Sequence, residues 1–593
     1  MTQAEPMGTG GTYLAWWIAG LGAAALLTTL GYSFELNDQL QYLLLPYRSI
    51  YPDFAPDDWF TWKTSHYHVS FSWIVRGLHQ LSGERYFPHA VFAAHLLNLL
   101  WLCLAITRMA QAHGAGLPGM VVAITVLALV RHEGVAGATL NHAQLLPADL
   151  ALPPMLLALS AWINGRSLHA GLWLGLSGLL HSNYALLGPM VVGLGEIAGL
   201  ALAGRSNERG LWQEWGRMAA GYLLFATPSL WLIARTFLIA DTAPEAVDTV
   251  FRVRSPHHYD LSALGSVDLW WPLFLLAWAA PALWRQRQER RSRAALMAYS
   301  VTAWLTVGVL GSWLEVGPLI RLFFFRLSPV LILLLLLSVG GFLDQVRRSQ
   351  REARTPMLLW AATGVLGLCS FARSDMELLG VFGLESSLFG LPAVFAVALA
   401  GLAAMRRARA PAVLAAAIAA VAAVQAARAE PIMHERRGAV RKPVMRGPRV
   451  GRFVWNHQHA HVKDEALMSW VRNNTPTHAV FLIPPSLISF RLRTRRAVFV
   501  DFKAAPMRGE EVQEWKRRML LAMGTEDFPT VGYPLRFVAG ERFCERPLHE
   551  LAKLARAEDL DYIVSRHGTS GRKSGLRRVA NLEEYSVYQV MRR

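Results

Sequence analysis

Charged residues are scarce in this chain. Only 17% of its 593 residues are Asp, Glu, Lys or Arg, and 53% are hydrophobic. Soluble domains of ordinary composition carry roughly 25% charged residues. The composition therefore excludes an ordinary soluble protein of this size and predicts one large membrane domain.

Cysteine and the familiar catalytic motifs are also lacking. The three cysteines, Cys103, Cys369 and Cys544, are far apart, which excludes a disulfide framework and zinc-ligand spacing. The sequence has no GxxxxGKS/T, no convincing GxGxxG unit, no GxSxG and no HExxH. Nucleotide hydrolysis and serine hydrolysis therefore have no support.

Long apolar runs are what the sequence has instead. They have spanning or near-spanning length, judged against the roughly 17–25 residues that cross a bilayer. The runs cover residues 13–33, 87–107, 118–131, 145–163, 169–186, 188–204, 218–238, 267–284, 295–314, 322–343, 356–372, 383–404 and 411–428. This predicts a mainly α protein, a polytopic helical membrane bundle of about 13 spans.

The net charge of +17 lies largely in short basic clusters between these runs, which favours a membrane protein over a nucleic-acid binder. The clusters fall in alternate loops, and the positive-inside rule places those loops in the cytoplasm. We therefore expect a membrane protein with a cytoplasmic N-terminus. The predicted outer segments are 34–86, 132–144, 239–266, 373–382 and the tail from 429.

The tail has a different pattern. Short apolar strands at 479–483, 496–501, 561–564 and 585–590 alternate with amphipathic helices at 464–474 and 510–521. This alternation predicts a small extracytoplasmic α/β domain. The predicted organisation is a membrane domain over 1–428, a basic linker over 429–462 and a periplasmic α/β domain over 463–593.

Carboxylates gather in the first outer loop. Glu35 and Asp38 are three residues apart after the first span, and Asp57-Asp58 follow two prolines. A carboxylate at this position can act as a general base or bind a divalent cation such as Mg or Mn. Polar residues that merely end a helix, or a solvated turn, explain the same spacing.

Histidines occur on the same predicted side. His66 and His68 are two residues apart in the first loop, and His142 and His181 lie near the outer ends of later spans. Ionisable groups at membrane depth are candidates for a functional site, although a hydrogen-bonded core histidine is an equal alternative for His181.

Basic and aromatic residues recur in two further outer positions. Arg254 is followed closely by His257-His258-Tyr259, and Arg321 and Arg326 precede a span. A guanidinium group can donate two hydrogen bonds to a phosphate, so these residues are candidates for binding an anionic lipid head group. Snorkelling to the membrane surface would explain one of Arg321 and Arg326, but not both.

Several stretches carry a family resemblance. They are Asn37-Asp38-Gln39, Tyr51-Pro52-Asp53, Leu180 to Tyr184, Arg254 to Tyr259, Asn474-Thr475-Pro476, Phe490-Arg491 and Arg495 to Lys503. With the many spans they resemble the GT-C superfamily of membrane glycosyltransferases and, more narrowly, a family of uncharacterised multi-pass bacterial membrane proteins. The superfamily usually has an adjacent acidic pair in the first loop. Here Asn37-Asp38 stands near the first helix and Asp57-Asp58 comes later, so the resemblance leaves open which acid is catalytic.

The resemblance implies an integral glycosyltransferase of the bacterial inner membrane that uses a polyprenyl-phosphate sugar and an unknown acceptor. Asp38 would be the general base in an inverting displacement, and Arg254, Arg321 or Arg326 would hold the leaving phosphate. A metal is not required. Two other hypotheses stay open: a transporter or flippase for a lipid-linked substrate, and a non-catalytic scaffold for envelope assembly.

Overall fold

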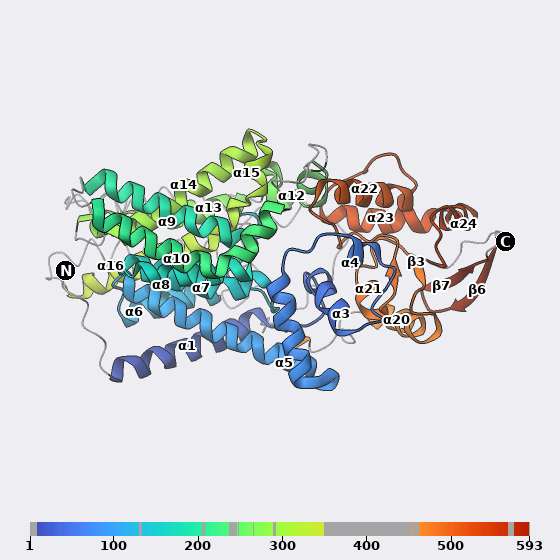
Figure 1. The fold of residues 1–593 in the computed structure, drawn as a ribbon, viewed down its shortest axis with the longest axis horizontal. Coiled ribbons are helices and arrows are strands. Elements are labelled where there is room, and N and C mark those ends of the chain that lie inside the picture. Colours follow the sequence, from blue (N-terminus) through green and yellow to red (C-terminus); the bar gives the residue numbers. More distant parts are fainter. Residues whose placement is uncertain are drawn as a thin grey trace, which may run out of the picture.

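A bundle of long helices occupies one end of the molecule and an α/β region occupies the other (Figure 1). The computed structural model describes residues 9–129, 133–203, 208–235, 246, 248–264, 266–288, 292–348, 453–454, 462–566 and 575–591. The three apolar runs predicted after residue 355, and nearly all of the predicted linker, lie outside these residues.

The first ten predicted apolar runs coincide with helices of the bundle. The long helices are α1 (Thr9–Leu30), α5 (Val69–Ala112), α6 (Leu117–Leu129), α7 (Pro147–Ile163), α8 (Ser167–Leu180), α9 (Ser182–Ala203), α10 (Glu208–Ile233), α13 (Ser266–Gln288), α14 (Ser292–Trp313) and α16 (Ser328–Arg348). Four segments of the described chain are helical, long and apolar enough to cross a membrane: 69–112, 182–201, 293–313 and 317–343. Shorter apolar helices cover 15–30, 147–163 and 167–180.

Close packing in the bundle depends on glycine at two crossings. A side chain at Gly119 would come within 2.8 Å of the Gly340 backbone, where α6 meets α16. At Gly171 it would come within 2.0 Å of the Met218 carbonyl oxygen, where α8 meets α10. Small residues at such points let helix backbones approach closely, which is how helices in a membrane gain contact area. The apolar residues of α16 are almost all buried at the centre of this core.

The first polar segment is largely helical, which the loop prediction for 34–86 missed. It contains α2 (Gln39–Tyr42), α3 (Leu44–Ile50) and α4 (Trp59–Lys63), and α5 already begins at Val69. Gly83, at φ 69°, divides α5 into two parts that run in different directions (Figure 1). The first part buries Phe71 and Val75, exposes Trp73 and Leu81, and carries the polar residues Arg76 and His79, which interrupt its apolar pattern.

Short elements connect the helices on the side that faces the α/β region. They are β1 (Tyr32–Ser33), η1 (Val135–Gly137), η3 (Thr249–Arg254), α12 (Pro256–Tyr259), η4 (Leu261–Ala263), α15 (Gly317–Arg321) and η5 (Phe324–Leu327). β1 pairs in parallel with β2 (Phe453–Val454). Because these connections are polar or irregular, they provide the residues that can face a ligand.

The predicted C-terminal α/β region is confirmed. Its strands are β3 (Val480–Leu482), β4 (Ala497–Val498), β5 (Tyr562–Arg566), β6 (Leu576–Asn581) and β7 (Tyr585–Val590), and they form one sheet in the order β4-β3-β5-β7-β6. The pairs β4-β3 and β3-β5 are parallel, while β5-β7 and β7-β6 are antiparallel. Its helices are α20 (Val462–Asn474), α21 (Phe490–Thr494), α22 (Gly509–Met523), α23 (Tyr533–Glu545) and α24 (Leu548–Ala557).

Candidate functional site

A cavity of about 1320 Å³ lies where the bundle meets the C-terminal region. Its volume exceeds the roughly 300–1,000 Å³ typical of small-molecule pockets. Most of the predicted site residues line it: Asp38, His66, His68, His181, Arg254, His257, His258, Tyr259, Arg321 and Arg326. Segments that are distant in sequence therefore line one cavity.

The charge of this cavity is predominantly positive. Among the described lining residues the only acids are Asp38 and Glu133. The permanently charged cations that line it are Arg254, Arg321, Arg326, Lys503 and Arg536. A cavity with this lining favours an anionic ligand, because like charges held together attract a counter-ion.

Asp38 is the candidate base, and it forms an ion pair with Lys503. Asp38 directly precedes α2, and its side chain is 41% exposed, compared with 15% for Lys503. Burial alone would raise the pKa of Asp38, but the charges of Lys503, His142 and His258 and the hydrogen bond from Lys503 lower it to about 2. The carboxylate is therefore ionised at physiological pH and partly accessible.

His142 is oriented by two partners beside this carboxylate. Its Nδ1 lies 2.8 Å from Asp149 Oδ1, and its Nε2 lies 3.0 Å from Thr139 Oγ1. Burial would lower the pKa of His142, but Asp149, and to a lesser extent Asp38, raise it. His142 can therefore carry a positive charge close to neutral pH. The contribution of Asp149 was not foreseen, although this residue comes two positions after Pro147 at the start of a predicted span.

His68 and His181 form part of the aromatic wall of the cavity. Their ring centroids lie 4.8 Å apart, and His68 also contacts Tyr42 at 5.0 Å. Burial lowers the pKa of His68 to about 3, helped by the charge of Arg326. His66 is held by Thr61, whose carbonyl oxygen lies 3.0 Å from Nε2. These rings are neutral at pH 7 and can serve as hydrogen-bonding surfaces.

The helix α12 places two further histidines in the cavity wall. His257 stacks on Tyr533 of the C-terminal region with centroids 4.6 Å apart, and His258 Nδ1 lies 2.7 Å from the Ala136 carbonyl oxygen. Burial is the main cause that lowers the pKa of His257 to about 4 and of His258 to about 3. The Tyr259 ring packs on Phe323 at 5.0 Å.

The three candidate arginines differ in what they already contact. Arg254 is buried and donates to the carbonyl oxygens of Phe502 and Lys503 at 2.9 and 3.3 Å. Arg326 stacks over the Phe323 ring at 5.1 Å, and its buried Nε has no hydrogen-bond partner among the described residues. Arg321 also lines the cavity. Arg326 is therefore best suited to accept a new anionic partner, because a buried donor without an acceptor is costly.

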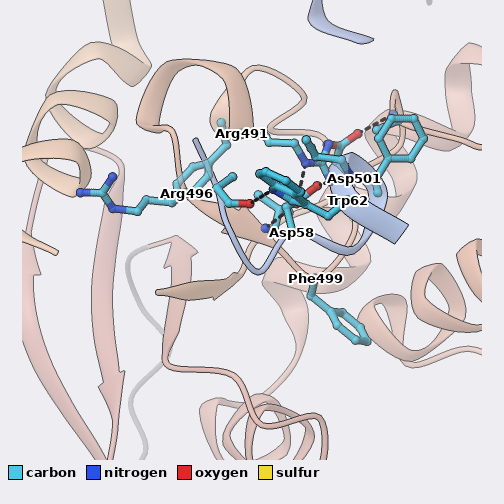
Figure 2. Close-up of polar contacts among 12 residues, drawn as sticks. Asp58, Trp62, Arg491, Arg496, Phe499 and Asp501 are labelled. Atoms are coloured by element: carbon cyan, nitrogen blue, oxygen red, sulfur yellow. Dashed lines mark hydrogen bonds and ion pairs between the residues drawn. The ribbon is translucent and has the colours of Figure 1, made fainter. Parts of the chain in front are cut away.

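Glu35 and Asp58 do not line the cavity. Glu35 accepts a hydrogen bond from the Tyr47 hydroxyl and is buried. Asp58 is fully buried and accepts from Arg491 Nε at 2.7 Å (Figure 2). Their carboxylates are engaged inside the protein, so the structure favours Asp38 among the three candidate acids.

The residues around Asp38 do not fit a divalent cation. The charged groups that act on Asp38 are Lys503, His142 and His258, and Asp149 is paired with His142. In the described part of the chain, no group of three or more His, Cys, Asp or Glu side chains could hold a metal ion. A hard cation prefers several oxygen ligands, which this arrangement does not supply.

Comparison with known proteins gives two kinds of match. Residues 462–522 match the family model described as a domain of unknown function, DUF6798. No protein with a curated description matches the chain. The family match covers α20 to α22, and so includes Arg491 and Lys503.

Solved structures match over most of the chain. ArnT from Cupriavidus metallidurans, bound to undecaprenyl phosphate, is 14% identical over 99% of each chain, with a TM-score of 0.45. The archaeal oligosaccharyltransferase AglB from Archaeoglobus fulgidus, in complex with an inhibitory peptide and a dolichol-phosphate, is 12% identical over 94% of this chain and 70% of its own, with a TM-score of 0.46.

The chain is similar to each of these structures over more than nine-tenths of its own length. The similarity is at the level of overall arrangement, and no residue role or ligand is transferred from it.

Proposed function

We propose that this chain is an integral-membrane glycosyltransferase that moves a sugar from a polyprenyl-phosphate donor to an extracytoplasmic acceptor. The observation that carries the proposal is a partly exposed carboxylate, Asp38, in a large cavity whose other charged groups are mainly cations. A lipid-linked phosphate supplies the matching anion, and the apolar helices around the cavity can accommodate its chain.

The proposed reaction is an inverting displacement. The acceptor hydroxyl or amine attacks the anomeric carbon, the bond from that carbon to the phosphate oxygen breaks, and the acceptor proton passes to Asp38. The departing polyprenyl phosphate gains a negative charge, which Arg326 is placed to stabilise, as charge-assisted hydrogen bonds to phosphate are the strong ones.

The pKa of Asp38 is low because Lys503 pairs with it, and the proposed donor would change this pairing. A carboxylate with a pKa of about 2 is a weak base, since base catalysis works best when the pKa is near the operating pH. A phosphate entering the cavity would compete for the Lys503 ammonium and add a negative charge near Asp38. Both effects raise the pKa of the carboxylate, so the donor itself would activate the base.

Release of polyprenyl phosphate tests the proposal without knowledge of the acceptor. Purified protein in lipid vesicles is given a radiolabelled polyprenyl-phosphate sugar and an envelope extract, and the freed lipid phosphate is measured. We expect release by wild type above the background of vesicles without protein. Binding of the donor without release would support the transporter alternative, and neither binding nor release would support the scaffold.

A further inference from the structure

One wall of the cavity belongs to the C-terminal region. Phe502, Lys503, Tyr533 and Arg536 line it opposite the bundle. Lys503 forms the ion pair with Asp38, although the two residues are 465 positions apart. The position of this lysine therefore depends on how the C-terminal region is held against the first loop.

The short segment Asp501–Lys503 is held by three side chains. Arg491 Nη1 donates to Asp501 Oδ2 at 2.5 Å, and Trp515 Nε1 donates to the Asp501 carbonyl oxygen at 3.0 Å. Arg254 of the bundle donates to the next two carbonyl oxygens, of Phe502 and Lys503. The backbone that carries Lys503 is thus fixed from both the bundle and the C-terminal region.

Arg491 also reaches the first loop, as Figure 2 shows. Its Nε donates to Asp58 Oδ2 at 2.7 Å, and both side chains are almost completely buried. Asp58 additionally accepts from the backbone nitrogens of Thr61 at 2.7 Å and Val498 at 3.0 Å. One guanidinium therefore bridges two buried carboxylates, Asp58 and Asp501, on segments that flank the cavity.

Apolar packing surrounds this bridge. Leu492 and Ala504 of the C-terminal region are buried in the same cluster as Phe54 and Phe60 of the first loop. Arg518 lies over the Trp59 ring, 4.6 Å from its centroid. The two segments share a core, so the bridge is part of a packed interface and is shielded from water.

We infer that Arg491 is a positioning residue for this site: by bridging Asp58 and Asp501 it holds Lys503 against Asp38, so the C-terminal region completes the site. The functional role of the cavity rests on the proposed function, whereas the positioning of Lys503 by Arg491 does not. A planar guanidinium can donate to two carboxylates in a fixed geometry, and a lysine ammonium at the same position cannot reproduce this fork. Without the two contacts from Arg491 to Asp58 and Asp501, the segment that carries Lys503 should become more mobile.

The chemical reactivity of Lys503 reports on this positioning without any sugar transfer. Full-length protein in detergent is treated briefly with an amine-acylating reagent, and the labelled lysines are quantified by peptide mass spectrometry. Lys553, an exposed residue of α24, is the internal reference. In wild type we expect slow labelling of Lys503, because it is 15% exposed and paired with Asp38.

Arg491→Lys should increase the labelling of Lys503 several-fold relative to Lys553. Asp58→Asn, which keeps the size of the side chain but removes its charge, should do the same if Arg491→Lys does not fold. Asp38→Asn frees Lys503 directly and sets the upper limit of the effect. The matched control is Arg517→Lys, because Arg517 also bridges two carboxylates, Glu514 and Glu558, but at the exposed surface.

Unchanged labelling of Lys503 in Arg491→Lys and Asp58→Asn would overturn the inference. An equal rise at Lys553 would also contradict it, because that outcome is a general loosening of the C-terminal region. If the protein proves not to transfer sugar, the labelling result still stands, so the failure of the proposed function and the failure of this inference are separable.

Discussion

At the scale of residues, the ion pair between Asp38 and Lys503 could not be foreseen. The sequence indicated Asp38 as a candidate acid and included Lys503 in a family-like stretch, but nothing in either pattern joins them. The same holds for Asp58, whose partner Arg491 is 433 positions away. Local spacing indicates which residue types could act, whereas long-range folding decides which carboxylate remains accessible.

Replacing Asp38 tests its proposed role as the base. Asp38→Asn keeps the shape of the side chain but removes its ability to accept a proton. Loss of a general base typically lowers the rate by a factor on the order of 10²–10⁴. We expect that loss in polyprenyl phosphate release, with normal insertion and purification. Full activity of Asp38→Asn would assign proton transfer to another group.

Replacing Lys503 should change the pH dependence of the reaction. Lys503 lowers the pKa of Asp38, while burial raises it. In Lys503→Met the lowering contribution is lost, so the pKa of Asp38 rises. Activity that needs the carboxylate is lost as the pH falls through this pKa, so the acid limb of kcat/KM should move to higher pH. An acid limb at the same pH in both proteins would show that Lys503 does not control Asp38.

At the scale of elements, hydropathy predicted the bundle helices well and the irregular segments poorly. The ten apolar runs in the described residues are helices, because apolar length is a direct signal. The first part of α5 was missed since its polar residues, among them Arg76 and His79, interrupt the apolar pattern. Strand β6 was missed because its exposed arginines, typical of an edge strand, look like a loop.

The bridge between the first loop and α21 should contribute strongly to stability. Arg491→Ala leaves Asp58 and Asp501 buried without their cation, and removing one partner of a buried ion pair typically costs about 3–5 kcal/mol. We expect a clear fall in Tm in detergent. Arg517→Ala, at an exposed ion pair, should change stability by only about 0–1 kcal/mol. Equal effects of the two substitutions would contradict the structural role of the bridge.

At the scale of the whole molecule, the account requires the cavity and the C-terminal region to lie outside the cytoplasm. The basic loop clusters predict this orientation. An alkaline phosphatase fused after Arg593 should be active in cells, and a fluorescent protein that folds only in the cytoplasm should be dark at the same position. The reverse pattern would place the cavity on the cytoplasmic side, where an extracytoplasmic acceptor could not reach it.

The arginines of the cavity have separable roles in the whole molecule. Arg254 already donates to backbone carbonyl oxygens of the C-terminal region, so its loss should weaken the contact between the two parts. Arg326 keeps a buried donor without a partner among the described residues. Arg326 is therefore the residue whose loss should affect the lipid phosphate most directly.

Binding of a short-chain polyprenyl phosphate to the purified protein tests the central claim most directly. We expect saturable binding by wild type that excess inorganic phosphate does not abolish, because the lipid chain adds apolar contact. Charge-assisted hydrogen bonds contribute about 1.5–3 kcal/mol each, so Arg326→Ala should weaken binding about tenfold to a hundredfold. Arg326→Lys should recover part of this loss, and Arg517→Ala should bind as wild type does. Absence of binding by wild type, or equal binding by Arg326→Ala, would contradict the account.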